Sequence, residues 1–364
     1  MITRRSRNRP GKGTAALPLA LSLLIAGALA AACSSPGSSA SGGGSPAAGS
    51  SSQASNGAAS NGAASTASLS DVTLHIGDQA GSGAQALLTA AGLINKLPFK
   101  VVWSDFTSGP PMLQAMGAGS VDVGAVGDAP PIFAAAGGEK IAVVAATAAN
   151  PAGTALLVPK NSPVHSVAQL KGKRIAVAEG SSSNYHLVAV LKKAGLSVHD
   201  VTIENLQPAQ ATAAFASGHV DAWDVWTPFL EQAEVQHGAR LLINGSTIGK
   251  TYSFEVASRA ALADPARAKA IGAYLQLIAR AHAWANTHPQ QWGTVWARAT
   301  GLPAGLMVQA AKDSTAVTVP VSSGVIGSEQ SIANVFTGAG LIPGHVPFAS
   351  FAVTTFNDTA GGTR

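Results

Sequence analysis

A run of serines at one predicted helix start is the clearest chemical signal in the sequence. Ser181, Ser182 and Ser183 lie between a predicted buried strand at 175–179 and a predicted helix at 185–193. The first turn of a helix has free backbone N–H groups and a partial positive charge, and serine hydroxyls add further donors. This combination predicts a site for a small tetrahedral anion, and serines acting as ordinary N-caps are the alternative explanation.

Catalytic motifs do not account for this loop. It lacks the GxxxxGK[ST] spacing of a nucleotide-binding P-loop and the GxSxG arrangement of a nucleophilic serine. The nine histidines are scattered, with no HxH or HExxH pair, and a single cysteine excludes an internal disulfide or a cysteine-based zinc site. We therefore predict a binding protein without a metal, a cofactor or catalytic residues.

Positive charge is concentrated at the start of the chain. The 364 residues carry 23 Lys and Arg against 18 Asp and Glu, a formal net charge of +5. Five of the cations lie in the first twelve residues, and no charged residue follows until Asp71. The rest of the chain is neutral and lacks the positive field of proteins that bind nucleic acids, so we expect no nucleic-acid partner.

The first 70 residues have the order of an export signal followed by a tether. The basic start precedes an apolar run at 15–32, which is too short and too rich in alanine to favour a permanent membrane span. The run ends at Cys33, in a context that resembles the lipobox of bacterial lipoproteins. We predict a lipoprotein signal peptide over residues 1–32, then a lipidated Cys33 and a disordered Ser/Gly/Ala tether over residues 33–70. A soluble secreted protein without lipidation is the alternative.

Strands and helices alternate over most of the remaining chain. Apolar patterns at 72–76, 99–103, 141–147, 174–178 and 201–205 predict strands, with helical patterns between them. After about residue 263 the pattern becomes helical. This order is typical of an α/β protein with mainly parallel sheets, and it suggests that the helical C-terminal part packs onto a lobe already formed.

Two stretches of sequence 99 residues apart resemble each other. Residues 119–122 and 218–221 both read Gly-X-Val-Asp, and each follows an alanine-rich helical pattern and opens an apolar strand. At the same offset, Asp128 and Thr227 end those strands, just before prolines near a helix start. We interpret the repeat as two lobes of similar build that present helix N-termini where ligands of open α/β sheets bind. Chance similarity in an alanine-rich chain is the alternative.

Several motifs occur in a consistent order between residues 72 and 351. They are Gly127-Asp128-Ala129-Pro130-Pro131, Leu157-Val158-Pro159-Lys160-Asn161, Gly180-Ser181-Ser182-Ser183 and Val220-Asp221-Ala222-Trp223. Together they resemble the aliphatic sulfonate binding proteins of ABC importers, within a group that also binds taurine, nitrate and thiamine-pyrimidine precursors. The resemblance implies the type II periplasmic binding protein fold, with two α/β lobes, a ligand cleft between them and a helical C-terminal part.

The resemblance also implies where the lobes begin and end. Lobe 1 is expected to be discontinuous and to comprise residues 71–156 and 257–364, while lobe 2 comprises residues 157–256. The two strands that cross between the lobes are expected near 155–159 and 252–258.

The ligand-binding residues carried over from the family come from both lobes. Ser181, Ser182 and Ser183 are the expected anion donors. Gln79 is an expected polar contact after the first strand, and Asp128 with the backbone that follows it forms the lobe 1 helix start. Trp223 and Trp226 are expected walls for the alkyl group of the ligand. Because positions three apart in a strand face opposite sides, at least one of these tryptophans is expected in the core unless the strand ends between them.

Two acidic residues depart from the family pattern. Asp78 stands beside Gln79 where an aromatic residue is frequent, and Asp224 occupies a position where an apolar residue is common. A carboxylate that faces a sulfonate is unfavourable unless the ligand also carries a cationic amine. These residues therefore indicate either a zwitterionic ligand such as taurine or simple solvation of the two carboxylates.

The function implied by the resemblance is that of an extracytoplasmic receptor, held on the outer face of the cytoplasmic membrane by its lipid. It would bind an alkanesulfonate as a monomer and deliver it to an ABC permease and its ATPase. Receptors of the same fold for taurine, nitrate or a thiamine-pyrimidine precursor are alternatives. An enzyme that makes the thiamine pyrimidine is an alternative of another class, but it needs a Schiff-base lysine and an iron-binding histidine cluster, and the histidines here are scattered.

Overall fold

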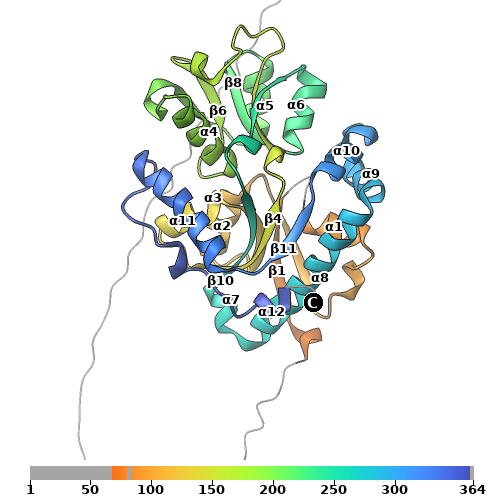
Figure 1. The fold of residues 1–364 in the computed structure, drawn as a ribbon. Coiled ribbons are helices and arrows are strands. Elements are labelled where there is room, and N and C mark those ends of the chain that lie inside the picture. Colours follow the sequence, from red (N-terminus) through yellow and green to blue (C-terminus); the bar gives the residue numbers. More distant parts are fainter. Residues whose placement is uncertain (1–67, 80–82, 361–364) are drawn as a thin grey trace, which may run out of the picture. The chain divides into compact units, whose positions relative to one another are not determined.

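The computed structural model of the protein describes residues 68–79 and 83–360 (Figure 1). The predicted signal peptide, the lipidation site at Cys33 and the tether up to residue 67 lie outside the described residues. In the part of the chain that is described, no helix combines the length and the apolar composition that a membrane span requires.

Two sheets form the centre of the described chain. One has six strands in the order β11-β4-β10-β3-β1-β2, and the other has five in the order β7-β6-β8-β5-β9. The strands are β1 (Thr73–Gln79), β2 (Lys100–Phe106), β3 (Val123–Gly127), β4 (Ile141–Ala149), β5 (Thr154–Val158), β6 (Arg174–Val177), β7 (Thr202–Asn205), β8 (Ala222–Trp226), β9 (Arg240–Asn244), β10 (Thr251–Ser258) and β11 (Ala316–Val319). β1, β2 and β3 are parallel, as are β6, β7 and β8.

Helices cover both faces of each sheet, as expected for α/β layering (Figure 1). The helices are α1 (Ala84–Ala90), α2 (Gly109–Gly117), α3 (Ala129–Ala136), α4 (Ser182–Lys193), α5 (Pro208–Ala216), α6 (Phe229–His237), α7 (Arg259–Ala263), α8 (Pro265–Thr287), α9 (Pro289–Thr300), α10 (Ala304–Asp313), α11 (Ser323–Gly338) and α12 (Asn357–Ala360). α1, α8, α9 and α10 share one core with the six-stranded sheet, whereas α2, α3 and α11 share another. On the five-stranded sheet, α4 lies in one core, and α5 and α6 lie in the other.

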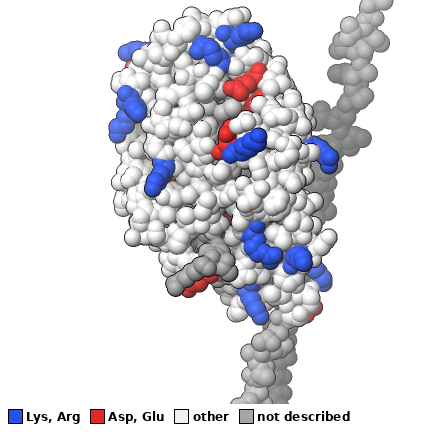
Figure 2. All heavy atoms as spheres, turned by 45° about the vertical axis from the view of Figure 1, so that its right-hand side comes forward, with Lys and Arg blue, Asp and Glu red and all other residues white. Residues whose placement is uncertain are grey.

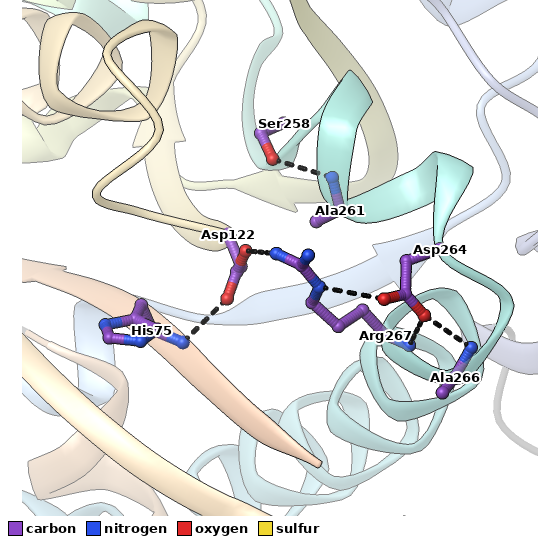
Figure 3. A network of polar contacts seen from close by, with 7 residues as sticks. All are labelled: His75, Asp122, Ser258, Ala261, Asp264, Ala266 and Arg267. Atoms are coloured by element: carbon purple, nitrogen blue, oxygen red, sulfur yellow. Dashed lines mark hydrogen bonds and ion pairs between the residues drawn. The ribbon is translucent and has the colours of Figure 1, made fainter. Parts of the chain in front are cut away.

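The predicted internal repeat corresponds to one interaction made twice. Asp122 Oδ2 accepts a hydrogen bond from the His75 N–H at 2.9 Å, and 99 residues later Asp221 Oδ2 accepts one from the Arg174 N–H at 2.9 Å. Each aspartate N–H donates back to the carbonyl of the same partner at 2.8 Å. Asp122 also forms an ion pair with Arg267 of α8, with 3.1 Å between Asp122 Oδ1 and a guanidinium nitrogen of Arg267 (Figure 3). The start of β3 is therefore tied to β1 in the same way as the start of β8 is tied to β6.

The chain crosses between the sheets slightly before the predicted places. β4 and β10 belong to the six-stranded sheet, whereas β5 and β9 belong to the five-stranded sheet. The crossings therefore fall at 150–153 and 245–250. The C-terminal part is helical as expected except for β11, an edge strand that pairs antiparallel with β4.

Charged side chains are sparse on the surface. Figure 2 shows one face, on which uncharged residues dominate and Lys and Arg side chains stand singly or in small groups rather than in one continuous patch. Any attraction for an anion on this protein is therefore expected to be local.

Candidate ligand-binding site

A cavity of about 340 Å³ lies between the two lobes. From the six-stranded lobe it is lined by residues at the ends of β1 and β3, including Gln79 and Asp128. From the five-stranded lobe it is lined by the start of α4 and the end of β8, including Ser181, Ser182 and Trp226. Its volume is in the range typical of small-molecule sites. The cavity thus lies at the carboxyl ends of parallel strands, where the internal repeat predicted a ligand.

The serine run forms the N-terminus of α4. The Ser181 Oγ accepts a hydrogen bond from the Asn184 N–H at 3.2 Å, while its hydroxyl donates to the Ala178 carbonyl at 2.6 Å. The helix begins at Ser182, earlier than the sequence pattern suggested. Among the described residues, the N–H groups of Ser182 and Ser183 form no hydrogen bond. Ser182 lines the cavity and Ser183 lies directly behind it, so α4 offers the free Ser182 N–H and the positive end of its dipole to the cavity.

Gly180 shapes the turn that leads into α4. Its φ is +70°, a left-handed conformation that favours glycine, and a Cβ at this position would lie 3.0 Å from the Phe133 ring of the other lobe. The turn therefore needs glycine both for its backbone conformation and for the close approach of Phe133.

The start of α3 is chemically different from that of α4. Asp128 is its N-cap, and the Asp128 Oδ1 accepts the Ala129 N–H at 2.8 Å. The next two residues are Pro130 and Pro131, which have no N–H to donate. Burial raises the pKa of Asp128, against the lowering effect of a hydrogen bond from Ser182. The α3 terminus therefore contributes its dipole and the Asp128 carboxyl to the cavity, while its first three residues, Ala129 to Pro131, offer no free N–H.

The two lobes meet closely beside this helix start. A Cβ on Gly127 would lie 3.2 Å from the Ser182 Cβ and closer still to its Oγ. A second contact joins the lobes where the Ser108 hydroxyl of lobe 1 donates to Gln207 Oε1 of lobe 2 at 2.7 Å. The absence of a side chain at residue 127 is what lets the N-terminus of α4 approach the end of β3.

The two predicted tryptophan walls have different environments. Trp226 lines the cavity and packs edge-to-face on Phe229, with ring centroids 5.9 Å apart. Trp223 is only 1% exposed and packs in the lobe 2 core beside Phe215. Opposite orientation is expected for positions three apart in β8, which continues through Trp226.

Five of the seven predicted ligand residues line the cavity in the described part of the chain, and Ser183 and Trp223 do not. The Ser183 side chain is fully buried. Its Oγ has no hydrogen-bond partner among the described residues, and it lowers the pKa of Asp224 rather than acting on groups in the cavity.

The two acidic residues that depart from the family pattern are both engaged elsewhere. Asp78 accepts hydrogen bonds from the N–H groups of Gln79, Ala84 and Gln85, at 3.1, 2.7 and 3.1 Å, so it ties the end of β1 to the start of α1. Asp224 is completely buried, and its Oδ2 lies 2.8 Å from His186 Nδ1. In the described structure, neither aspartate is among the residues that line the cavity.

The lining also includes titratable residues that the sequence analysis did not single out. His186 of α4, Glu255 of β10 and His282 of α8 line the cavity, together with Trp292 and Trp296 of α9. Burial and the charge of Asp78 raise the pKa of Glu255 to about 8, and burial lowers the pKa of His282 to about 4. No Lys or Arg of the described residues lines the cavity. Strand and helix patterns do not distinguish these residues from core, because their burial depends on how distant elements pack.

Two α/β lobes with a ligand-sized cavity between them define a periplasmic binding protein fold. The alkanesulfonate-binding protein SsuA from Xanthomonas axonopodis pv. citri, solved bound to MOPS, matches with a TM-score of 0.72 and 34% identity, over 77% of this chain and 98% of that one. The model of the NMT1/THI5 like family matches residues 108–292. An aliphatic sulfonates-binding protein of Escherichia coli (strain K12) is 36% identical over 75% of this chain and 86% of its own length. The chain belongs to the NMT1/THI5 like family.

More distant matches indicate how widely the fold is used. A taurine-binding periplasmic protein of Escherichia coli (strain K12) is 30% identical, over 41% of this chain and 46% of its own length. The desulfurization enzyme DSZB shares the fold at 16% identity, with a TM-score of 0.57. The fold by itself therefore does not separate receptors from enzymes, and function has to be argued from the site and the nearer relatives.

Proposed function

We propose that the protein is the sulfonate-binding component of an ABC importer. The observation that carries the proposal is the start of α4, where the N–H groups of Ser182 and Ser183 are unpaired and Ser182 lines the cavity between the lobes. A sulfonate is a permanent monoanion with tetrahedral geometry, and a helix N-terminus holds such a group without a counter-charge. The named functions of the nearer relatives support the same ligand class.

In this proposal the sulfonate lies against α4, and the rest of the ligand extends along the cavity. Gln79 and Asp128 contribute polar contacts from lobe 1. Trp226 provides an aromatic wall for the alkyl chain. Ser181 acts through the helix start that it caps, rather than through a direct contact.

Delivery and location form part of the same proposal. The protein would be exported, lipidated at Cys33 and held by residues 34–70 on the outer face of the cytoplasmic membrane, where it would pass its ligand to an ABC permease with its ATPase. Labelling with a radioactive fatty acid in wild type and Cys33→Ala tests the lipid anchor, because the variant is expected to incorporate no label.

A taurine receptor is the second candidate, supported by the taurine-binding relative.

Isothermal titration calorimetry tests the ligand class. Ethanesulfonate, taurine, nitrate and sulfate are titrated separately into the protein, in a buffer that contains no sulfonate. Saturable one-to-one binding of at least one sulfonate, stronger than that of nitrate or sulfate, is expected. Binding of a neutral or cationic solute without a response to any sulfur oxyanion would contradict the proposal.

A further inference from the structure

A second polar region lies in the cavity, on the face of the six-stranded sheet that α8 and α9 cover. Glu255 is 6% exposed, lines the cavity, and has an Oε2 atom without a hydrogen-bond partner among the described residues. Buried polar atoms without partners are rare in folded proteins, because each loses its hydration. The Glu255 carboxyl therefore needs an explanation that the structure of lobe 1 does not supply.

Three more unpaired polar atoms accompany Glu255. His282 Nδ1 and Trp296 Nε1 belong to residues that line the same cavity, and the Tyr274 hydroxyl is fully buried on α8. None of the three atoms has a hydrogen-bond partner among the described residues. Unpaired polar atoms on residues that line a cavity are expected where a polar part of a ligand binds.

The charges around Glu255 favour a cation as that part of the ligand. Asp78 is the charged neighbour that acts on the Glu255 pKa, and Glu255 and Asp78 both raise the pKa of Tyr274. Burial keeps His282 neutral at physiological pH. Trp292 and Trp296 stack with ring centroids 5.3 Å apart and line the cavity, so they offer aromatic faces, which attract ammonium groups.

We propose that Glu255, with His282 and the Trp292–Trp296 pair, forms an ammonium subsite, and that the substrate is therefore an aminoalkanesulfonate. The inference rests on the proposed function. It assigns the sulfonate to the N-terminus of α4 and the ammonium group to the region around Glu255. It also assigns the carboxylate that faces the ammonium group to Glu255, which has an unpaired oxygen, rather than to Asp78 or Asp224, which have other partners.

Binding then has a proton balance that can be measured. Near neutral pH the free Glu255 side chain is a neutral acid. An ammonium group stabilises its carboxylate, so the O–H bond of Glu255 breaks, an ion pair with the ligand forms, and one proton passes to solvent. An alkanesulfonate without an amine leaves Glu255 protonated and releases no proton.

The test is a titration with a pH electrode in unbuffered salt solution at pH 7, combined with calorimetry. The probes are taurine, 3-aminopropanesulfonate and ethanesulfonate. For the wild type we expect an aminosulfonate to bind at least tenfold more tightly than ethanesulfonate and to release close to one proton. Equal affinity for the three probes, or aminosulfonate binding without proton release, would overturn the proposal.

Two variants distinguish a specific role of the Glu255 carboxyl from the general effect of replacing a buried glutamate. Glu255→Gln is expected to lose the proton release and the preference for amines while its affinity for ethanesulfonate changes less than threefold. Glu329→Gln alters another buried glutamate, which does not line the cavity in the described structure, and should leave both properties unchanged. Proton release that persists in Glu255→Gln would show that the amine itself loses the proton, and would contradict the assignment. If no sulfonate binds to the wild type, it is the proposed function that fails.

Discussion

His186 and Asp224 form a buried pair directly behind the start of α4. The Nδ1 of His186 lies 2.8 Å from the Oδ2 of Asp224, and the two side chains are 1% and 0% exposed. Burial lowers the pKa of His186, but the Asp224 carboxylate, together with the Asn244 backbone and the charge of Asp128, raises it by more, so that the pKa lies above its usual value. The pair joins α4 to β8, and it accounts for an acidic residue at a position where the family commonly has an apolar one.

Removing one member of this pair should destabilise the protein strongly. Asp224→Ala leaves His186 buried without its partner, and breaking a buried ion pair in this way costs about 3–5 kcal/mol. Urea unfolding measures the loss, and NMR titration of His186 should show its pKa falling in any variant that stays folded.

The double variant His186→Leu/Asp224→Leu is the matched control. It should recover part of the lost stability, because it leaves neither charge unpaired. Lys171→Ala removes an exposed ion pair with Asp200 and should have a much smaller effect. If Asp224→Ala is no more damaging than Lys171→Ala, the buried pair does not hold α4 in place.

Glu255 should lower the stability of the fold as pH rises from about 5 to 8, whereas His282, whose pKa burial lowers to about 4, acts in the opposite direction below its ordinary pKa of 6.5. A group whose pKa is higher in the folded state than in the unfolded chain binds more protons when folded, so it favours folding at low pH and loses that effect as pH rises through the folded pKa. Glu255 has an ordinary pKa of 4.5 that is raised to about 8. Between these two pKa values, ionisation of Glu255 lowers the free energy of unfolding by up to about 1.4 kcal/mol for each pH unit.

Urea unfolding of wild type and Glu255→Gln between pH 5 and 9 checks this dependence. The variant cannot ionise at this position, so its profile should be flatter. Burial also raises the pKa values of Asp128 and Glu329, so some slope should remain. Identical slopes for the two proteins would show that Glu255 does not titrate as described.

A side chain at residue 127 should weaken ligand binding. The Cβ of Gly127→Ala would press against Ser182 and move the N-terminus of α4 away from β3. We expect a loss of affinity of about tenfold, or about 1.4 kcal/mol, measured by calorimetry. Adding Ser182→Ala removes the nearest oxygen and should restore part of the affinity.

Gly327→Ala is the control for this substitution, because nothing lies within 4 Å of the Cβ it would add. It should leave affinity unchanged. Unchanged affinity in Gly127→Ala as well would mean that the contact between Gly127 and Ser182 is not part of the binding geometry.

The two tryptophans should respond differently to truncation. Trp223→Ala removes a core side chain and should destabilise the protein by about 3–5 kcal/mol, with little change in the affinity of the folded fraction. Trp226→Ala should leave most of the stability and reduce ligand affinity several-fold, because it removes a wall of the cavity. Urea unfolding and calorimetry on both variants check this, and an equal effect on affinity would contradict the different environments of the two residues.

Much of the fold was predictable because local patterns report local structure. The alternating elements, the repeat that links Asp122 to Asp221 and the opposite faces of Trp223 and Trp226 all follow from period and spacing. β11 was not predicted, since a four-residue edge strand has too few positions to show a period. Its place is set by pairing with β4, which is distant in sequence.

The anion end of the site was easier to predict than the other end. The run from Ser181 to Ser183 has a mechanism that depends only on neighbouring residues, since a helix start presents its own donors. For Glu255 the sequence pattern indicates only a strand near the lobe crossing. Its significance depends on burial under α8 and α9, and on Asp78 and Asp224 having other partners, which no local pattern reveals.

The most direct test of the account is a crystal structure of the protein with propanesulfonate bound. We expect the sulfonate in the cavity between the lobes, with its oxygens within hydrogen-bond distance of the Ser182 and Ser183 N–H groups and its alkyl chain against Trp226. A sulfonate bound away from the N-terminus of α4, with these N–H groups still unpaired, would contradict the central claim.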